Sequence, residues 1–170
     1  MRRLYLLRHA KSSWDDPGLD DHDRPLAPRG RRAVKLLADY VESHDIHPAQ
    51  VLCSTARRAL ETLDGVAIKG EPIIERDLYA ASPTTLLDRL GQIDPDTPSV
   101  MVVGHNPTLQ VLVLRLAGAN GGAEEELELV RRKFPTGALA TLEFQCEWSE
   151  LSAGGAKLVG VVRPKDLYGG

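Results

Sequence analysis

Short apolar runs of strand length alternate with stretches of helical period along this chain. Residues 3–8 have the length and composition of a buried strand. Pro28 suits the first turn of a helix, in which Val34, Leu37 and Val41 recur at helical spacing. The same alternation predicts further strands at residues 51–53, 72–74, 100–103, 138–144 and 158–162. It predicts further helices from Ser54 to about Val66, from Pro83, from Pro107 to Gly118 and from Glu124 to Arg132. Ser54 and Ser82 are the expected N-caps of the first two of these helices.

This order of elements predicts an α/β fold. Residues 100–103 are uniformly apolar, which is typical of a strand covered on both faces. Helices between successive strands indicate parallel pairing. Residues 138–144 alternate as a half-exposed strand does, and residues 158–162 are its expected partner. Because no repeat or linker divides the chain, we expect residues 1–170 to form a single-domain three-layer sandwich, with helices on both faces of a mostly parallel sheet.

Polar residues directly follow three of the predicted strands. They are Arg8 and His9 after the first strand, Ser54, Arg57 and Arg58 after the second, and Gly104, His105 and Asn106 after the fourth. Because the carboxyl ends of parallel strands meet at one edge of a sheet, we expect these residues to converge there. Each piece alone also fits an ordinary surface helix or a capped turn. Together, arginines, histidines and free amides at a helix N-terminus predict a pocket for a dianionic phosphoryl group.

The composition of the chain excludes some classes of partner but does not indicate a further functional site. The net charge of −3 and an aromatic content of 5% give no reason to expect nucleic acid or an anionic membrane as partner. No apolar run approaches the roughly 18 residues that span a bilayer. The basic start, residues 1–3, precedes only four apolar residues, too few for a signal peptide, so we expect a cytoplasmic location.

The two cysteines do not predict a disulfide framework, a zinc site or a nucleophile. Cys53 and Cys146 are too few and too far apart for the first two. Cysteine-based phosphatases carry an arginine after five intervening residues. That position is Ala59 here, and Arg58 falls one residue short, so the spacing rejects Cys53 as a nucleophile.

Three motifs together resemble the histidine phosphatase superfamily. Residues 6–10, Leu-Leu-Arg-His-Ala, are similar to its Arg-His-Gly signature, with Ala10 in place of the glycine. Residues 54–62 are similar to the stretch in which Ser precedes Arg-Ala and then Thr, although Thr55 stands where proline is usual. Residues 103–107, Val-Gly-His-Asn-Pro, are similar to the second histidine motif.

Two further stretches indicate a branch of this superfamily. The loop at residues 23–26 and the later residues 136–139 are similar to the small branch that includes the phosphohistidine phosphatase SixA. The alignment implied by the resemblance places the phosphate-binding arginine of the second motif on Arg58 and leaves Arg57 as a neighbour.

The resemblance implies a mechanism and a role for each matched residue. His9, neutral, attacks phosphorus and forms a phosphohistidine intermediate that water hydrolyses. Arg8 and Arg58 bind the phosphoryl oxygens, and His105 is expected to be a cationic further donor. Asn106, at the start of the following helix, is expected to add a backbone amide. No metal and no cofactor are implied, because the cationic side chains supply the charge.

The proton donor for the leaving group stays open at this stage. In the wider superfamily a carboxylate after the third strand has this role, and Glu75 and Asp77 both lie near that place. Glu75 beside Arg76 equally fits a surface ion pair. The chain has little room for the long insertions of the larger mutases. An open, shallow site suits a phosphorylated protein side chain better than a small metabolite.

We therefore expect a metal-independent phosphatase that hydrolyses protein phosphohistidine, with a phosphorylated protein or a small phosphorylated molecule as its partner. One alternative is a phosphatase for small phosphate esters from the same superfamily. Another is a phosphate-binding module without turnover. A third is a metal-dependent hydrolase that uses residues 21–23, Asp-His-Asp, although no second histidine–aspartate set has ligand spacing.

Overall fold

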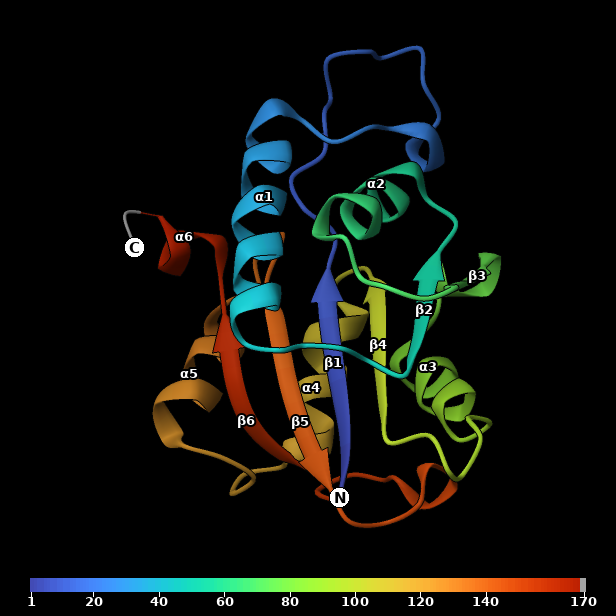
Figure 1. The fold of residues 1–170 in the computed structure, drawn as a ribbon, viewed down its shortest axis with the longest axis vertical. Helices are drawn as coiled ribbons and strands as arrows, with labels where there is room; N and C mark the ends of the chain where they lie inside the picture. Colours follow the sequence, from blue (N-terminus) through green and yellow to red (C-terminus); the bar gives the residue numbers. More distant parts are fainter. Residues whose placement is uncertain (169–170) are drawn as a thin grey trace.

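Residues 1–168, which the computed structural model describes, are arranged around one six-stranded sheet of order β3-β2-β4-β1-β5-β6 (Figure 1). The strands are β1 (Arg2–Arg8), β2 (Gln50–Ser54), β3 (Ile73–Glu75), β4 (Ser99–Gly104), β5 (Leu139–Phe144) and β6 (Lys157–Val162). The helices are α1 (Pro28–Ser43), α2 (Arg57–Val66), α3 (Pro83–Leu90), α4 (Thr108–Ala117), α5 (Glu124–Arg132) and α6 (Pro164–Leu167). The single domain predicted for residues 1–170 includes Gly169 and Gly170, which lie outside the described residues.

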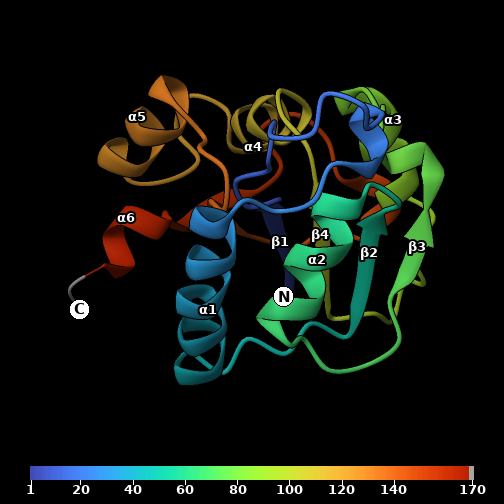
Figure 2. The same ribbon diagram turned by 90° about the horizontal axis from the view of Figure 1, so that it is seen from above.

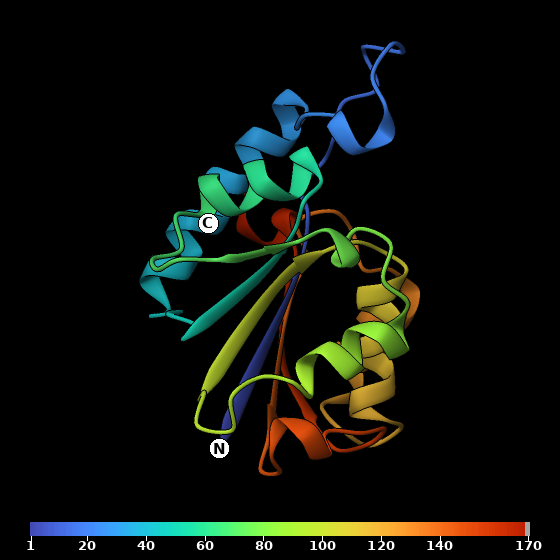
Figure 3. The same cartoon turned by 90° about the vertical axis from the view of Figure 1, so that its right-hand side faces the viewer.

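The sheet is mixed, and the three strands that end in the predicted polar residues belong to its parallel part. Strands β1, β2, β3 and β4 are paired in parallel, whereas β5 lies antiparallel to both β1 and β6. Helices α1 and α2 cover one face of the sheet, and α3, α4 and α5 cover the other (Figure 3). The predicted α/β fold with helices on both faces is confirmed.

Alternation along the strands divides the core into two layers. Leu4 and Leu6 of β1 pack with the apolar side chains of α3, α4 and α5. Tyr5 and Leu7 point the other way and pack with those of α1 and α2. Because side chains alternate with period two along a strand, one apolar run supplies both layers. Among the described residues, no helix has the length and apolarity needed to cross a membrane.

Two local predictions at helix starts have different outcomes. Ser82 caps α3 as predicted, since its hydroxyl accepts from the amide of Thr85 at 3.0 Å. Ser54 was expected to cap the next helix, but it is the last residue of β2, and α2 begins only at Arg57. The Ser54 hydroxyl accepts from the amide of Ala56 and so shapes the turn between the two elements.

Strand β5 alternates in exposure as its sequence indicated. Ala140, Leu142 and Phe144 are buried in one layer of the core, whereas Thr141 and Glu143, on the opposite face, are partly exposed. Its predicted pairing with the last strand is confirmed.

The long polar loop after β1 is anchored at both ends. The amide of Ala27 donates to the carbonyl of Lys11 at 2.9 Å, and Ser12 and Leu26 form an isolated antiparallel bridge. A Cβ atom at Gly30 would lie 2.1 Å from the Lys11 carbonyl oxygen, so only glycine allows α1 to approach the start of the loop this closely. These contacts fix the path of residues 11–27 over the carboxyl-terminal edge of the sheet.

Candidate active site

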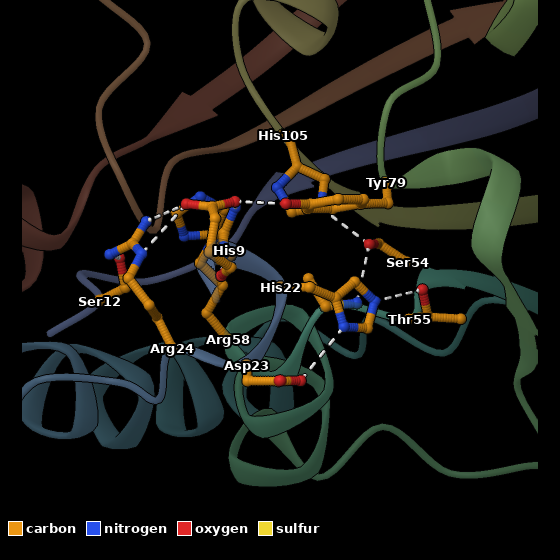
Figure 4. A network of polar contacts seen from close by, with 12 residues as sticks. His9, Ser12, His22, Asp23, Arg24, Ser54, Thr55, Arg58, Tyr79 and His105 are labelled. Carbon is orange, nitrogen blue, oxygen red and sulfur yellow. Dashed lines mark hydrogen bonds and ion pairs between the residues drawn. The ribbon is translucent and has the colours of Figure 1, made fainter. Parts of the chain in front are cut away.

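The carboxyl ends of β1, β2 and β4 bring the predicted polar residues together. Arg8 pairs in register with Gly104, so His9 and His105 extend side by side beyond neighbouring strands. Their ring centroids lie 5.2 Å apart. From β2, the Ser54 hydroxyl lies 2.8 Å from Nε2 of His105 (Figure 4).

His9 is held as a neutral base with one free nitrogen. Its Nδ1 lies 2.7 Å from the carbonyl oxygen of Ala10, which can only accept, so Nδ1 carries the proton and Nε2 keeps its lone pair. Burial, together with the charges of Arg58, Arg8 and Arg24, lowers the pKa of His9 to about 4, although the contact with the Ala10 carbonyl acts in the opposite direction. A neutral imidazole with an available Nε2 is a nucleophile.

Arg8 and Arg58 each keep one buried donor without a partner. Nη1 of Arg8 donates to the carbonyl of Phe134 at 3.0 Å, and the two terminal nitrogens of Arg58 donate to Asp21 at 2.7 and 3.0 Å. The Nε atoms of Arg8 and Arg58 are the only buried side-chain nitrogens or oxygens of residues 1–168 that lack a hydrogen bond. An unsatisfied buried donor costs about 1–3 kcal/mol, so two on neighbouring cations point to an anionic ligand.

Asp21 lies at the phosphoryl site, although the sequence analysis did not predict it there. Its carboxylate accepts hydrogen bonds from the Tyr79 hydroxyl, from Arg58 at 3.0 Å and from Arg24 at 3.1 Å. The Tyr79 hydroxyl, followed by Arg58 and Arg24, holds the pKa of Asp21 well below its usual range. Asp21 is therefore ionised, and it orients Arg58 instead of offering a proton.

Comparisons with known proteins agree with this geometry. Residues 4–79 match the family model of the histidine phosphatase superfamily (branch 1). An uncharacterized protein of Mycobacterium tuberculosis is 37% identical over 159 residues, which cover 94% of this chain and 100% of that protein. A solved structure from Nakamurella multipartitia, with the provisional name phosphohistidine phosphatase SixA, is 31% identical, covers 96% of each chain and has a TM-score of 0.84. The chain belongs to the histidine phosphatase superfamily.

Within this superfamily the chain is SixA-like. A structure of the protein histidine phosphatase SixA complexed with tungstate shares its fold, with a TM-score of 0.77 at 21% identity over 97% of this chain and 99% of that one. The resemblance predicted from three short motifs is thus confirmed over nearly the whole chain.

The His105 imidazole is neutral before a phosphoryl group binds. Burial, followed by the neighbouring His9 imidazole and the charge of Arg58, lowers its pKa to about 3, because cationic arginines and little solvent disfavour a further positive charge. A cationic His105 that donates to a bound phosphoryl group stays a prediction. A cavity of about 200 Å³ opens beside His105 and is also lined by Tyr79 and Asn106.

Asn106 lies at the site through its side chain. Its Nδ2 donates to the Phe134 carbonyl, the same oxygen that Arg8 contacts, and its Oδ1 accepts from the amide of Gln110. Helix α4 begins two residues later, at Thr108. The Asn106 side chain and Arg8 therefore share one acceptor, the Phe134 carbonyl. A contact between the Asn106 backbone amide and phosphate stays a prediction.

The structure does not bring Glu75 and Asp77 to the nucleophile. Glu75 is paired with Arg89 at 2.7 Å, and both carboxylates line a separate cavity with that arginine. Among residues 1–168, no hydrogen bond or ion pair joins either carboxylate to His9. Of the two interpretations of Glu75 left open by the sequence, the geometry favours the ion pair.

The residues of the metal hypothesis have other partners. Nε2 of His22 lies 2.8 Å from the Thr55 hydroxyl, and Asp21 is held by arginines. Within the described residues, no three His, Cys, Asp or Glu side chains form a set that could hold a metal ion. Burial raises the pKa of the Cys53 thiol to about 12, which agrees with its rejection as a nucleophile.

Arg24 and Tyr79 are two more residues of the site. Arg24, in the loop after β1, is 7% exposed, donates to the Ser12 hydroxyl at 2.7 Å and lies 3.5 Å from the centre of the Trp14 ring. Tyr79 lies four residues after the end of β3 and donates its hydroxyl to Asp21. Sequence reasoning missed both residues, because neither directly follows an apolar strand. The one available signal for Arg24 was its place three residues after an aspartate, in a loop whose only other lysine or arginine is Lys11.

We expect the His9 imidazole to stay neutral until the pH falls to about 4. A histidine pKa lowered by burial means that the charged form is populated only below that pH, so the nucleophile persists through pH 5. Histidine-selective ¹⁵N NMR checks this, with the His9 signals assigned by their loss in His9→Gln. Protonation near pH 6.5, or a neutral form with its proton on Nε2, contradicts the assignment.

Proposed function

We propose that this histidine phosphatase hydrolyses phosphohistidine in proteins through a covalent phosphohistidine on His9. The observation that carries the proposal is the pair of buried, unpartnered Nε donors on Arg8 and Arg58, the arginines whose charges act on His9. The similarity to structures named phosphohistidine phosphatase SixA supports the same substrate class.

The proposed chemistry needs two transfers. Nε2 of His9 attacks phosphorus while the phosphorus–nitrogen bond of the substrate breaks, and the departing imidazole takes a proton from solvent. Water then attacks the phosphohistidine enzyme, which releases inorganic phosphate and restores His9. In both steps, the free donors of Arg8 and Arg58 form hydrogen bonds to the phosphoryl oxygens and stabilise their negative charge in the transition state. The proposal includes no metal, because these cations supply the charge.

Within residues 1–168, no carboxyl group contacts His9, and this sets the expected substrate range. Asp21 is held ionised, and Glu75 is paired with Arg89. An imidazole or an acidic phenol leaves without strong help from an enzyme acid, whereas an alkoxide requires a positioned proton donor. This favours phosphoramidates and aryl phosphates over sugar and serine phosphates.

We expect turnover of a phosphohistidine protein and of para-nitrophenyl phosphate, and poor turnover of glucose 6-phosphate. Glu75→Gln and Asp77→Asn are expected to change kcat/KM on the first two substrates by less than about fivefold, since a poorly placed acid contributes little of the usual 10²–10⁴-fold. Phosphate release measured for each enzyme and substrate, with and without chelator, checks this.

Efficient cleavage of glucose 6-phosphate that is lost in Glu75→Gln or Asp77→Asn would overturn the substrate class and favour an ester phosphatase. Loss of all activity in chelator would restore the metal hypothesis. Phosphate binding without turnover of any substrate would indicate a binding module.

A further inference from the structure

A second groove, of about 340 Å³, lies between the start of α1 and the short helix α6. Figure 2 shows α6 beside α1. The groove has a cationic rim, formed by Lys11, Arg29, Arg163 and Lys165, and no carboxylate is among its lining residues. Two prolines, Pro135 and Pro164, contribute to an apolar floor.

The groove adjoins the phosphoryl site through the backbone. Lys11 follows His9 by two residues, a separation of at most about 7 Å along the chain. On the other side, Gly137 donates its amide to the carbonyls of Arg8 and His9, and Thr136 before it lines the groove. Two of the segments that line the groove are therefore joined directly to the backbone that carries Arg8 and His9.

The positive charge at the rim exceeds the negative charge beside it. Arg163 is paired with Asp166 at 2.8 Å, and the charge of Lys165 also acts on that carboxylate. Among residues 1–168, no ion pair includes Lys11, Arg29 or Lys165. The chain as a whole has a net charge of −3, so the cationic rim is a local feature of this groove. Such a surface is complementary to carboxylates that flank an apolar side chain.

We propose that this groove binds an acidic segment of the phosphorylated protein substrate. Carboxylates of that segment face Lys11, Arg29 and Lys165, and one apolar side chain rests on the prolines of the floor. A single apolar groove with a few cations at its rim fits a peptide better than a nucleic acid, which requires a row of cations that follows its backbone. The proposal rests on the proposed function for its substrate, while the groove itself is tested by binding alone.

The test compares two double variants with the same change of charge. Arg29→Glu with Lys165→Glu alters the groove, and Lys69→Glu with Lys157→Glu alters exposed lysines outside it. The probe is a fluorescein-labelled peptide of six glutamates around a central leucine, and its glutamine counterpart is the neutral control. Fluorescence anisotropy gives the Kd. We expect the groove variant to bind the acidic peptide at least about tenfold more weakly than wild type, and the control variant to bind within twofold of it.

Kinetics connect the groove to the substrate. The groove variant is expected to raise KM for an acidic phosphohistidine protein about tenfold, with kcat unchanged and with para-nitrophenyl phosphate turned over within twofold of wild type. No binding of the acidic peptide, equal binding of the glutamine peptide, equal weakening in both double variants, or tighter binding of decauridylate would each overturn the proposal. Peptide binding without any phosphatase activity would instead reject the proposed function and leave the groove assignment standing.

Discussion

Replacing His9 by alanine is expected to lower kcat by about 10⁴-fold or more, because it removes the only proposed nucleophile. Rapid quench into alkaline denaturant during turnover of ³²P-labelled phosphohistidine protein, followed by separation of the enzyme from the substrate protein, checks the intermediate directly. Wild type is expected to carry phosphate that is labile in acid and stable in alkali, as a phosphorus–nitrogen bond requires, whereas His9→Ala stays unlabelled. The structural reason is that the His9 imidazole is neutral and that its Nε2 is not engaged by the Ala10 carbonyl, which contacts Nδ1.

His47→Ala is the matched control, since that imidazole lies on the surface and its one ion-pair partner is Asp45. It is expected to keep wild-type turnover and labelling. An unlabelled wild-type enzyme that turns over substrate, or substantial turnover by a folded His9→Ala, contradicts the covalent mechanism. Circular dichroism shows whether each variant is folded.

The second large effect separates two adjacent arginines. Arg58→Ala is expected to lower kcat/KM by about 10²–10³-fold, the usual loss for one preorganised donor to a transition-state oxyanion. Arg57→Ala is expected to stay within about threefold, because neighbouring helix positions point about 100° apart. The structure supports this difference: Arg58 is 6% exposed and contacts Asp21, whereas Arg57 lies on the surface and pairs with Glu61.

Arg58→Lys sharpens this test. It keeps a positive charge but lacks the planar fork and the Nε donor, so it is expected to recover only part of the loss. Steady-state kinetics on para-nitrophenyl phosphate measure all three variants. If Arg57→Ala has the larger effect, the second motif is aligned one residue out of place.

Elements with a clear period were predicted closely, and so was the edge of the sheet where the site lies. The helix expected from Glu124 to Arg132 has those bounds, since acidic residues open it and arginines close it. His9 and His105 were brought together by strand order alone. The prediction that Ser54 caps a helix was wrong, because a serine before a helical pattern resembles a cap. Only the pairing of β2 shows that Ser54 belongs to the strand.

The parts of the site that the sequence did not predict depend on contacts between distant segments. Asp21 lies in a polar loop that looks solvated, and its partners Arg58 and Tyr79 are 37 and 58 residues away. The charge of His105 also depends on contacts between distant segments. Its pKa depends on burial and on cations from other strands, which no local pattern records.

The unpartnered Nε donors of Arg8 and Arg58 also link the site to the stability of the fold. Without an anion, folding removes these donors from water and provides no acceptor for them, which destabilises the folded state by about 1–3 kcal/mol for each donor. An anion that fills them binds the folded chain and not the unfolded one, so it shifts the folding equilibrium toward the native state. The free energy of unfolding is therefore lower without an anion than with one, and part of the affinity for a phosphoryl group comes from removing this instability.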